Sequence, residues 1–156
     1  MIFQPKYQYK PGFRCGIPIE KTVAVINGLA EQNRLTAKDL VEVSKDEDAP
    51  LHSYFEWDNE KCGEKWREQQ GRVLIANIVV QDVEDEKSEP VRAFFQIESE
   101  TSLYEPLTVI VKNEDKLQSL YDTAKRELKS FQKKYSRIKA FAGLFKEIDN
   151  LPDKAS

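Results

Sequence analysis

The chain has very few residues of the kinds that carry catalysis or bind metals. Its 156 residues include one histidine, His52, and two cysteines, Cys15 and Cys62, which lie far apart and form no CxxC pair. A structural zinc site needs four ligands, mostly cysteine and histidine at short spacings. A Cys–His nucleophilic pair needs an oriented base and an oxyanion hole, and nothing in the sequence marks either. The sequence therefore predicts no metal, no cofactor and no enzymatic activity.

Long apolar runs and nucleotide-binding motifs are also lacking. No apolar stretch approaches the roughly 18 residues that a membrane span needs, and the first residues lack the apolar segment of a secretion signal. The chain has no P-loop, GxGxxG or GxSxG motif. The acidic group at 82–86 lacks the spacing of an EF-hand, so it indicates a solvated turn. We expect a cytoplasmic protein with reduced cysteines and no membrane partner.

Charge, by contrast, is plentiful and unevenly distributed. Charged residues make up 33% of the chain, yet the net charge is only −3, so total charge alone does not indicate a nucleic-acid partner. Residues 31–60 hold nine acids and three bases, whereas residues 125–139 hold seven bases and one acid. The first 15 residues carry bases and no acid. A nucleic-acid role requires these bases to gather on a surface that neighbouring carboxylates do not neutralise.

Periodicity and capping residues predict an α+β fold. Pro18 begins a helix at 18–32, Thr36 caps a short helix at 37–44, and Asp58 caps a third at 59–77, with Cys62, Trp66 and Val73 along one side. Strands are predicted near 74–83, 91–99 and 107–113, as a small antiparallel sheet. We therefore expect an extended basic arm at 1–17, one α+β domain at 18–150 (helical region 18–77, strands 78–112, long helix 114–149) and a tail at 151–156.

The last predicted helix is the clearest element of the sequence. Asn113 caps it, and apolar residues recur at alternating spacings of four and three from Leu117 to Ile148, which is the pattern of a heptad seam. Gly143 weakens the helix near its end, and a second helix can begin at Ser136. The seam can be buried within the chain or against a second copy. A core of this size needs the surface, so burial within the chain is favoured.

The stretch from Pro50 to Ile75 holds His52 and both tryptophans, so it is the first place to look for chemistry. A zinc site built from Cys15, Cys62, His52 and a carboxylate is one reading. The structural reading explains more of the sequence, because Tyr54, Phe55 and Trp57 precede a helix cap as the apolar residues of a staple do. We interpret this stretch as a loop fixed to the third helix, in which His52 binds a backbone or carboxylate partner.

The first two predicted helices, joined by a short turn, have the order of a helix-turn-helix. The second helix of such a unit can enter the DNA major groove. Its outward residues here include Asp39, Glu42 and Asp46, and phosphate would repel them. Simple packing of two helices is the favoured interpretation.

The best electrostatic footprint combines the basic arm with the basic face of the last helix. Such arms can follow a phosphate backbone or stack on bases, and they can equally bind an acidic patch on another copy. Arg67 and Arg72 on the third helix are secondary candidates. The predicted nucleic-acid-binding residues are Lys6, Tyr7, Tyr9, Lys10, Arg14, Arg67, Arg72, Lys125, Lys129, Lys133, Lys134 and Arg137.

Five short motifs stand in order along the chain: Leu35-Thr36, Pro50-Leu51-His52, Phe55-x-Trp57-Asp58, Trp66-Arg67 and Arg72-x-Leu74-Ile75. Together with the long helix that follows, they resemble a family of uncharacterised proteins carried by bacteriophages and prophages. The resemblance covers about residues 7–148. It departs at Cys62-Gly63, where the family has small alanine-like residues, and at Gly71. It implies phage–host biology and a bacterial host cell, and it implies no particular activity.

The sequence thus predicts a non-enzymatic, phage-type protein associated with nucleic acid. DNA is the expected partner, the protein is expected to form a homo-oligomer, and a host or phage protein is a further possible partner. The alternative is a protein–protein interaction or phage assembly module that uses the heptad seam and the arm without nucleic acid.

Overall fold

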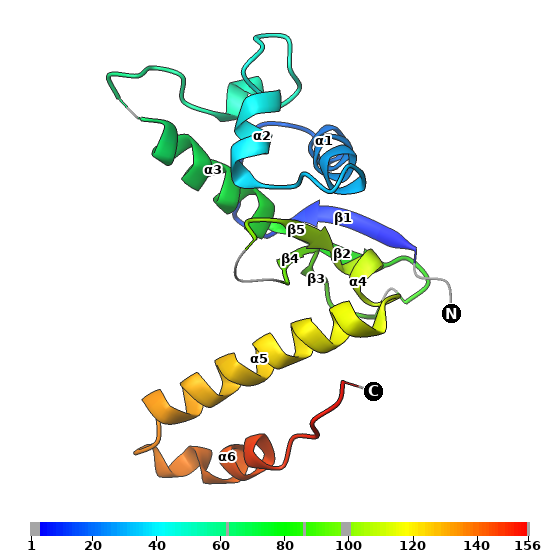
Figure 1. Cartoon of the computed structure of the whole chain (residues 1–156), viewed down its shortest axis with the longest axis vertical. Helices are drawn as coiled ribbons and strands as arrows, with labels where there is room; N and C mark the ends of the chain where they lie inside the picture. The colour runs from blue at the N-terminus through cyan, green and yellow to red at the C-terminus, as the bar shows by residue number, and fades with distance from the viewer. Residues whose placement is uncertain (1–3, 62, 86, 98–100, 156) are drawn as a thin grey trace. The chain divides into compact units, whose positions relative to one another are not determined.

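The computed structural model describes residues 4–61, 63–85, 87–97 and 101–155, which form two compact units. Unit 1 covers residues 1–109 and unit 2 covers residues 110–156 (Figure 1). The predicted class, an α+β fold with an N-terminal helical region, a small antiparallel sheet and a long C-terminal helix, is confirmed. Unit 1 contains β1 (Pro5–Tyr9), α1 (Ile19–Glu31), α2 (Ala37–Val43), the 3₁₀ helix η1 (His52–Tyr54), α3 (Glu64–Ala76), β2 (Ile78–Asp82), β3 (Val91–Arg92), β4 (Phe94–Gln96) and β5 (Tyr104–Pro106).

The first two helices begin and end close to where the sequence predicts. Pro18 precedes α1, and the Thr36 side chain caps α2 by accepting a hydrogen bond from the Asp39 N–H at 2.9 Å. Asn33 turns the chain between them with φ of 55°, a conformation that asparagine tolerates better than most residues. Leu35, which follows this turn, is fully buried. The helix–turn–helix order is therefore a packing arrangement inside unit 1.

Helix α3 begins later than predicted. The predicted helix at 59–77 with Asp58 as its cap is wrong, because α3 starts at Glu64 after Gly63. Asp58 instead accepts a hydrogen bond from the Glu60 N–H at 2.9 Å, which closes a local turn that competes with the helix. Trp66 and Val73, predicted to face inward, are exposed, and the buried positions are Gly71, Leu74 and Ile75. The predicted role of Cys62 lies outside the described residues.

Strands from both ends of unit 1 form its main sheet. The order is β1–β2–β3, all antiparallel, with Pro5 opposite Asp82 and Tyr9 opposite Ile78. Residues predicted as an extended arm are thus extended, but residues 5–9 form an edge strand of the sheet. β4 and β5 form a separate two-stranded sheet.

Two strand predictions are wrong in detail. The segment 91–99 is divided between β3 and β4 because Ala93, which is buried, donates its N–H to Ile78 and accepts from Leu107, so the chain changes sheets there. The segment 107–113 is not a strand. It begins with the short helix α4 (Leu107–Ile110), despite its β-branched residues, and the pairing partner of β4 is β5 just before it.

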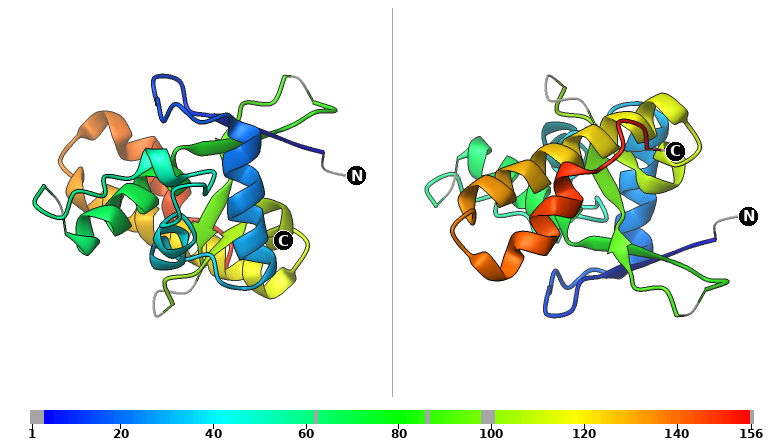
Figure 2. Two further views of the ribbon diagram at one scale, coloured as in Figure 1. Left: turned by 90° about the horizontal axis from the view of Figure 1, so that it is seen from above. Right: turned by 90° about the horizontal axis from the view of Figure 1, so that it is seen from below.

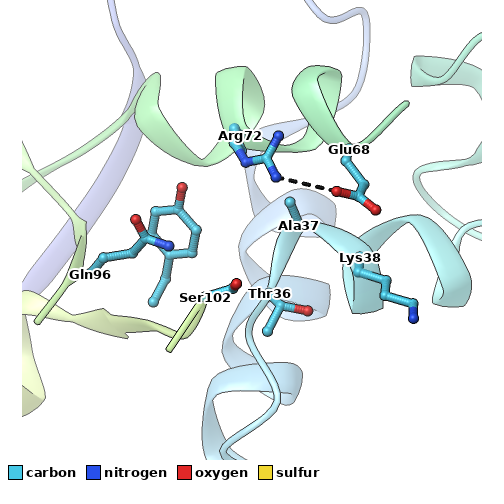
Figure 3. Close-up of a pocket in the computed structure, with 8 residues that line it drawn as sticks. Thr36, Ala37, Lys38, Glu68, Arg72, Gln96 and Ser102 are labelled. Atoms are coloured by element: carbon cyan, nitrogen blue, oxygen red, sulfur yellow. Dashed lines mark hydrogen bonds and ion pairs between the residues drawn. The ribbon is translucent and has the colours of Figure 1, made fainter. Parts of the chain in front are cut away.

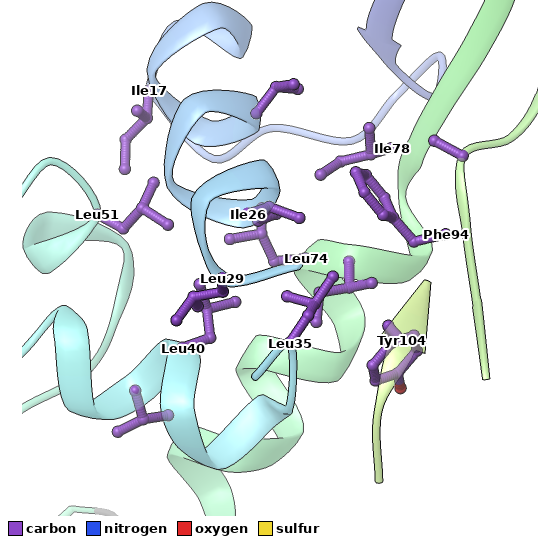
Figure 4. Close-up of a cluster of buried hydrophobic side chains, with 14 of the residues drawn as sticks. Ile17, Ile26, Leu29, Leu35, Leu40, Leu51, Leu74, Ile78, Phe94 and Tyr104 are labelled. Atoms are coloured by element: carbon purple, nitrogen blue, oxygen red, sulfur yellow. The ribbon is translucent and has the colours of Figure 1, made fainter. Parts of the chain in front are cut away.

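The core of unit 1 lies between α1, α2, α3 and the two sheets (Figure 4). Ile26 of α1, Leu40 of α2 and Leu74 of α3 are fully buried. The α2–α3 contact is close at Gly71, where an added Cβ would lie 3.4 Å from the Ala37 carbonyl oxygen. Close packing of three helices on a small sheet therefore explains why the stretch from residue 17 to residue 104 forms one core.

Unit 2 is a helical hairpin. Helix α5 (Glu114–Lys134) is capped by Asn113 as predicted, with its side chain accepting from the Lys116 N–H at 3.0 Å. The prediction of one helix over 114–149 is wrong, because α5 ends at Lys134 and the chain returns through the 3₁₀ helix η2 (Lys139–Phe141) and α6 (Ala142–Asp149) (Figure 2, right). Aromatic rings explain the return: Phe131 packs against Tyr135, Phe141 and Phe145, with centroids 4.8–6.5 Å apart. The heptad seam is thus shared between α5 and α6.

Candidate nucleic-acid interface

The aromatic residues predicted to bind nucleic acid in the arm belong to the core of unit 1. The ring of Tyr7 stacks on Phe94 with centroids 6.0 Å apart. The Tyr9 hydroxyl donates to the Ile17 carbonyl at 3.0 Å and lies 2.6 Å from the Thr22 hydroxyl. Burial raises the pKa of Tyr9 well above its ordinary value. These two rings are committed to packing, so they do not form a platform for bases.

The three basic residues of the arm remain at the surface. Lys6, Lys10 and Arg14 are exposed, and none forms an ion pair within the described residues. Lys6 points from β1 and Lys10 follows its end, while Arg14 lies in the loop before α1. They are three exposed cations on β1 and the loop after it, and the aromatic residues that the sequence grouped with them pack in the core instead.

Arg67 and Arg72 on α3 both interact with other side chains of unit 1. The Arg67 guanidinium lies 5.5 Å from the centre of the Trp57 ring and donates to the Asn59 side chain at 3.2 Å. Arg72 forms an ion pair with Glu68 at 3.2 Å, one helical turn earlier. Both arginines therefore help to fix α3 and the loop beside it.

Arg72 also borders a hollow of about 300 Å³ between α2, α3 and β5 (Figure 3). The lining combines one acid, already paired with Arg72, with amide and hydroxyl groups from Gln96, Ser102 and Thr36. Such a lining contains no nucleophile paired with a base. The hollow is open to solvent and lined mainly by polar side chains.

The stretch from Pro50 to Ile75 is a loop fixed to α3, as predicted. His52 Nδ1 lies 2.9 Å from the Ser44 carbonyl oxygen, and its ring stacks on Trp57 with centroids 4.9 Å apart. Trp57 in turn donates its indole N–H to the His52 carbonyl at 2.8 Å. The predicted backbone partner of His52 is therefore confirmed.

Tyr54 attaches this loop to α3. Its hydroxyl donates to the Gln70 carbonyl at 2.9 Å, and burial raises the pKa of Tyr54 to about 12. Tyr54 thus contacts the middle of α3, and Trp57 lies beside Arg67 in its first turn. Among the described residues, no three of the side chains His, Cys, Asp and Glu are grouped as metal ligands. The predicted zinc reading also involves Cys62, which lies outside the described residues.

Two of the basic residues predicted on the last helix are neutralised by their own unit. Lys125 lies 3.1 Å from the Asp153 carboxylate, and Lys129 lies 2.7 Å from the Asp149 carboxylate. Gln132 also donates to Asp149 at 3.1 Å. Hydrogen bonds from Lys129 and Gln132 hold the pKa of Asp149 below its usual value. The side of α5 that carries Lys125 and Lys129 therefore faces α6 and the C-terminal residues.

A different group of cations stays unpaired where α5 ends. We call it the basic turn; it contains Lys133, Lys134, Arg137 and Lys139. All four are exposed, and within the part of the chain that the structure describes none has an acid at ion-pair distance. Lys134 lies over the Tyr135 ring, with its Nζ 5.2 Å from the centre. Phe131, whose exposed fraction is 37%, lies one helical turn before Tyr135.

The chain reversal separates two sets of lysines that the sequence could not tell apart. The spacing of four that groups Lys125, Lys129 and Lys133 predicts one face, yet the first two bind carboxylates of the returning chain. Ser136 and Gly143 were the only signals of that reversal. Lys139 is added to the set because the turn brings it next to the end of α5.

The two units carry opposite net charge. Residues 1–109 hold 13 Lys and Arg against 20 Asp and Glu, whereas residues 110–156 hold 11 against 7. Unit 2 is therefore cationic in a chain that is anionic overall. A local field of this sign attracts anions at distances up to about 10 Å at ordinary ionic strength.

No helix among the described residues is long and apolar enough to cross a membrane. Comparison with protein-family models, with curated proteins and with solved structures gave no match, so the resemblance to phage proteins stays a prediction.

Proposed function

We propose that this protein associates with nucleic acid without catalysing a reaction, and that the basic turn of unit 2 binds the phosphate backbone. One observation carries the proposal: four exposed cations lie within seven residues of chain, and no described carboxylate pairs with them. Phosphate contacts from Lys and Arg supply most of the affinity of non-specific binding. Two lysines of the predicted set, Lys125 and Lys129, are not part of this proposed site because they already form ion pairs with Asp153 and Asp149.

Aromatic side chains beside the basic turn favour single-stranded over duplex nucleic acid. Phe131 and Tyr135 lie at the end of α5. Both rings pack in the hairpin, but Phe131 is 37% exposed, and a base can stack on the part of a ring face that remains accessible. We therefore assign base stacking to Phe131 and Tyr135 in place of Tyr7 and Tyr9, which pack in the core of unit 1. A phage or prophage origin, with the cytoplasm of a bacterial host as the place of action, accords with such binding.

The test measures binding of a fluorescent single strand and of a duplex over a range of salt concentrations. The double variant Lys133→Glu/Lys134→Glu should weaken binding at every salt concentration. It should also flatten the slope of log affinity against log salt by about 0.7 for each lost contact on a single strand, or about 0.9 on a duplex. Lys133→Gln/Lys134→Gln should do the same to a smaller extent, and it avoids placing acids at a helix C-terminus.

A matched control makes the same charge change in unit 1. The variant Lys21→Glu/Lys65→Glu replaces two exposed lysines in the first turns of α1 and α3, where acids are favourable. It should leave both affinity and salt slope unchanged. If the control weakens binding as much as the basic-turn variant, the effect comes from net charge and the proposed site is wrong. If neither strand binds at low salt, the nucleic-acid function itself is wrong.

A second candidate, a protein–protein or phage assembly module, has an observation of its own. Around the basic turn, Leu128, Phe131, Ile138 and Leu144 are all more than a third exposed. Such side chains gathered on a short hairpin are typical of a contact surface. The double variant Ile138→Ser/Leu144→Ser discriminates between the candidates: it should abolish a protein contact and leave the salt slope of nucleic-acid binding unchanged.

A further inference from the structure

β1 is an edge strand with an open side. In its ladder with β2, the even-numbered residues point their backbone groups inward: Lys10 donates its N–H to Asn77, and Gln4 accepts from Val83. In an antiparallel ladder the residues between them point outward. The N–H and C=O groups of Tyr7 and Tyr9 on that side have no hydrogen-bond partner in the part of the chain that the structure describes.

The position of Pro5 agrees with this alternation. Pro5 lies opposite Asp82 at an outward-pointing position, so its missing N–H costs the sheet no hydrogen bond. The other edge, β3, has only two residues, and the Arg92 guanidinium folds back onto the Phe94 carbonyl at 2.8 Å. Of the two edges of this sheet, β1 is therefore the one that can accept another strand.

A hollow accompanies the open side of β1. It has a volume of about 330 Å³, it is open to solvent, and it is lined by Lys6, Tyr7, Ile19, Glu20 and Val23 from β1 and α1. In the right-hand view of Figure 2, β1 (dark blue) runs past α1 toward the N-terminus. A strand added to β1 would thus have backbone partners on one side and apolar side chains beside it, which is the arrangement used in recognition by strand addition.

We propose that the strand added here is β1 of a second copy of this chain, paired antiparallel about Tyr7. In this register the two Tyr7 residues exchange N–H and C=O hydrogen bonds, and each Tyr9 N–H donates to the partner's Pro5 carbonyl. The ladder ends there because Pro5 has no N–H to return. The result is one continuous antiparallel sheet with three strands from each copy.

Charge is the observation that selects a second copy. Pairing about Tyr7 places Lys6 opposite the partner's Gln8 and Lys10 opposite the partner's Gln4, so no lysine faces a lysine. Like charges directly opposite one another destabilise a strand pair, whereas amide and ammonium groups do not repel. A register shifted by two residues is centred on Lys6 or Gln8, and it places Lys6 opposite the partner's Lys6 or Lys10. A register shifted by four residues, centred on Pro5 or Tyr9, would lose hydrogen bonds at Pro5 or place the ends of the strands beyond the ladder. The self-complementary register is thus the one that the sequence of β1 permits.

The first experiment changes the charge opposite Lys6. Gln8→Glu creates two Lys–Glu cross-strand pairs in the dimer, and Gln8→Lys creates two Lys–Lys pairs. Sedimentation over a concentration series should show a dimer for the unchanged protein. Gln8→Glu should tighten dimerisation and Gln8→Lys should weaken it, each by roughly two- to thirtyfold. Thermal melts check that both variants fold. A protein that stays monomeric at every concentration overturns the proposal, and so do shifts of the same sign in both variants.

The second experiment tests the register. With both native cysteines replaced by serine, chains carrying Lys6→Cys are mixed with chains carrying Gln8→Cys and oxidised. Residues 6 and 8 would form a non-hydrogen-bonded pair across the dimer, with Cα atoms about 4.5 Å apart, which a disulfide can bridge. The mixture should form cross-linked dimers, and each variant alone should not. Equal cross-linking in the single variants overturns the register. This contact is independent of nucleic-acid binding by unit 2, because the Gln8 variants leave the basic turn unchanged.

Discussion

Unit 1 and unit 2 are each stabilised internally by a different kind of interaction. In unit 1, some twenty side chains from helices and strands are buried, and its net charge is negative. Among the described residues of unit 2 only Ile110 and Ile148 are buried, and α5 is joined to α6 and to the residues after it by four aromatic rings and by the ion pairs of Lys125 and Lys129. The hydrophobic burial that stabilises unit 1 changes little with moderate salt, whereas dissolved salt screens the exposed ion pairs of unit 2. Unit 2 should therefore respond to solvent conditions that leave unit 1 intact.

The sharpest test of this difference truncates one phenylalanine in each unit. Phe94 is fully buried under Tyr7, so Phe94→Ala should lower the free energy of unfolding of unit 1 by about 3–5 kcal/mol. Phe131 is more than a third exposed, so Phe131→Ala should cost only about 1 kcal/mol. Denaturant titrations followed by tryptophan fluorescence report on unit 1, since Trp57 and Trp66 both lie there, and the same titrations followed by circular dichroism also report on the helices of unit 2. An equal loss of unfolding free energy in the two variants would contradict this comparison, because it would mean that Phe131 contributes as much to unit 2 as a fully buried residue does to unit 1.

Glycine substitutions should have opposite signs in the two units. Gly71 faces the Ala37 backbone of α2, so Gly71→Val should overpack the α2–α3 contact and destabilise unit 1 by about 1–3 kcal/mol. Gly143 in α6 faces open space, so Gly143→Ala should stabilise the hairpin by about 0.5–1 kcal/mol through helix propensity. Circular dichroism melts measure both. A stabilised Gly71→Val variant would show that α2 and α3 can move apart at no cost.

The attachment of the Tyr54 loop to α3 should be weakened by high pH and by removal of the Tyr54 hydroxyl. Tyr54→Phe removes the hydrogen bond to the Gln70 carbonyl and should cost about 1 kcal/mol. The pKa of Tyr54 is raised from its ordinary 10 to about 12, so its hydroxyl contributes stability that is complete below pH 10 and is lost as the pH rises toward 12. Tyrosinate absorbance should therefore increase late for the unchanged protein. A titration that is identical in the Tyr54→Phe variant, apart from one ordinary tyrosine, would contradict this.

The smallest effect is expected for Asp149. Its pKa is lowered by Lys129 and Gln132, so the stability it contributes is present above the ordinary carboxyl pKa and is lost as the pH falls through the lowered value. Helicity of unit 2 should decline slightly in that acidic window, and the decline should be weaker in Asp149→Asn. Added salt at neutral pH should narrow the difference between the two proteins, because Asp149 and Lys129 are both exposed to solvent. A salt-independent difference would indicate a contact other than the ion pair.

Local signals in the sequence predicted most of the fold. Thr36 and Asn113 cap helices because a side chain oxygen meets a free N–H two or three residues on, and that geometry depends on neighbours in sequence alone. The strand after α3 and helix α1 were also predicted from local patterns, the strand from its β-branched residues and the helix from Pro18 and its apolar spacing. Where two local signals competed, as at Asp58, the turn prevailed over the cap, and the phase of α3 was misassigned.

Long-range pairing is the part that the sequence did not predict. Nothing near Tyr7 and Tyr9 indicates that β2 will pair beside them, and nothing near Lys129 indicates that Asp149 will return to it. Four of the residues at 107–113 are β-branched, yet 107–110 form α4, and β4 pairs with the segment before it. Of the basic residues predicted on the last helix, those at the end of α5 stay available for binding, whereas Lys125 and Lys129 pair with carboxylates of the returning chain.

The pairing of Pro5–Tyr9 with Ile78–Asp82 sets an order on biosynthesis. A ribosome releases β1 before β2, and the pairing of the two strands must wait until α1, α2, α3 and β2 have emerged. During that interval a nascent β1 exposes both of its edges, when strands are prone to mispairing. Pro5 and Lys6 of this short strand belong to the residue types that limit unintended strand pairing, so the residues at the edge of the finished sheet should also protect the unfinished chain from aggregation.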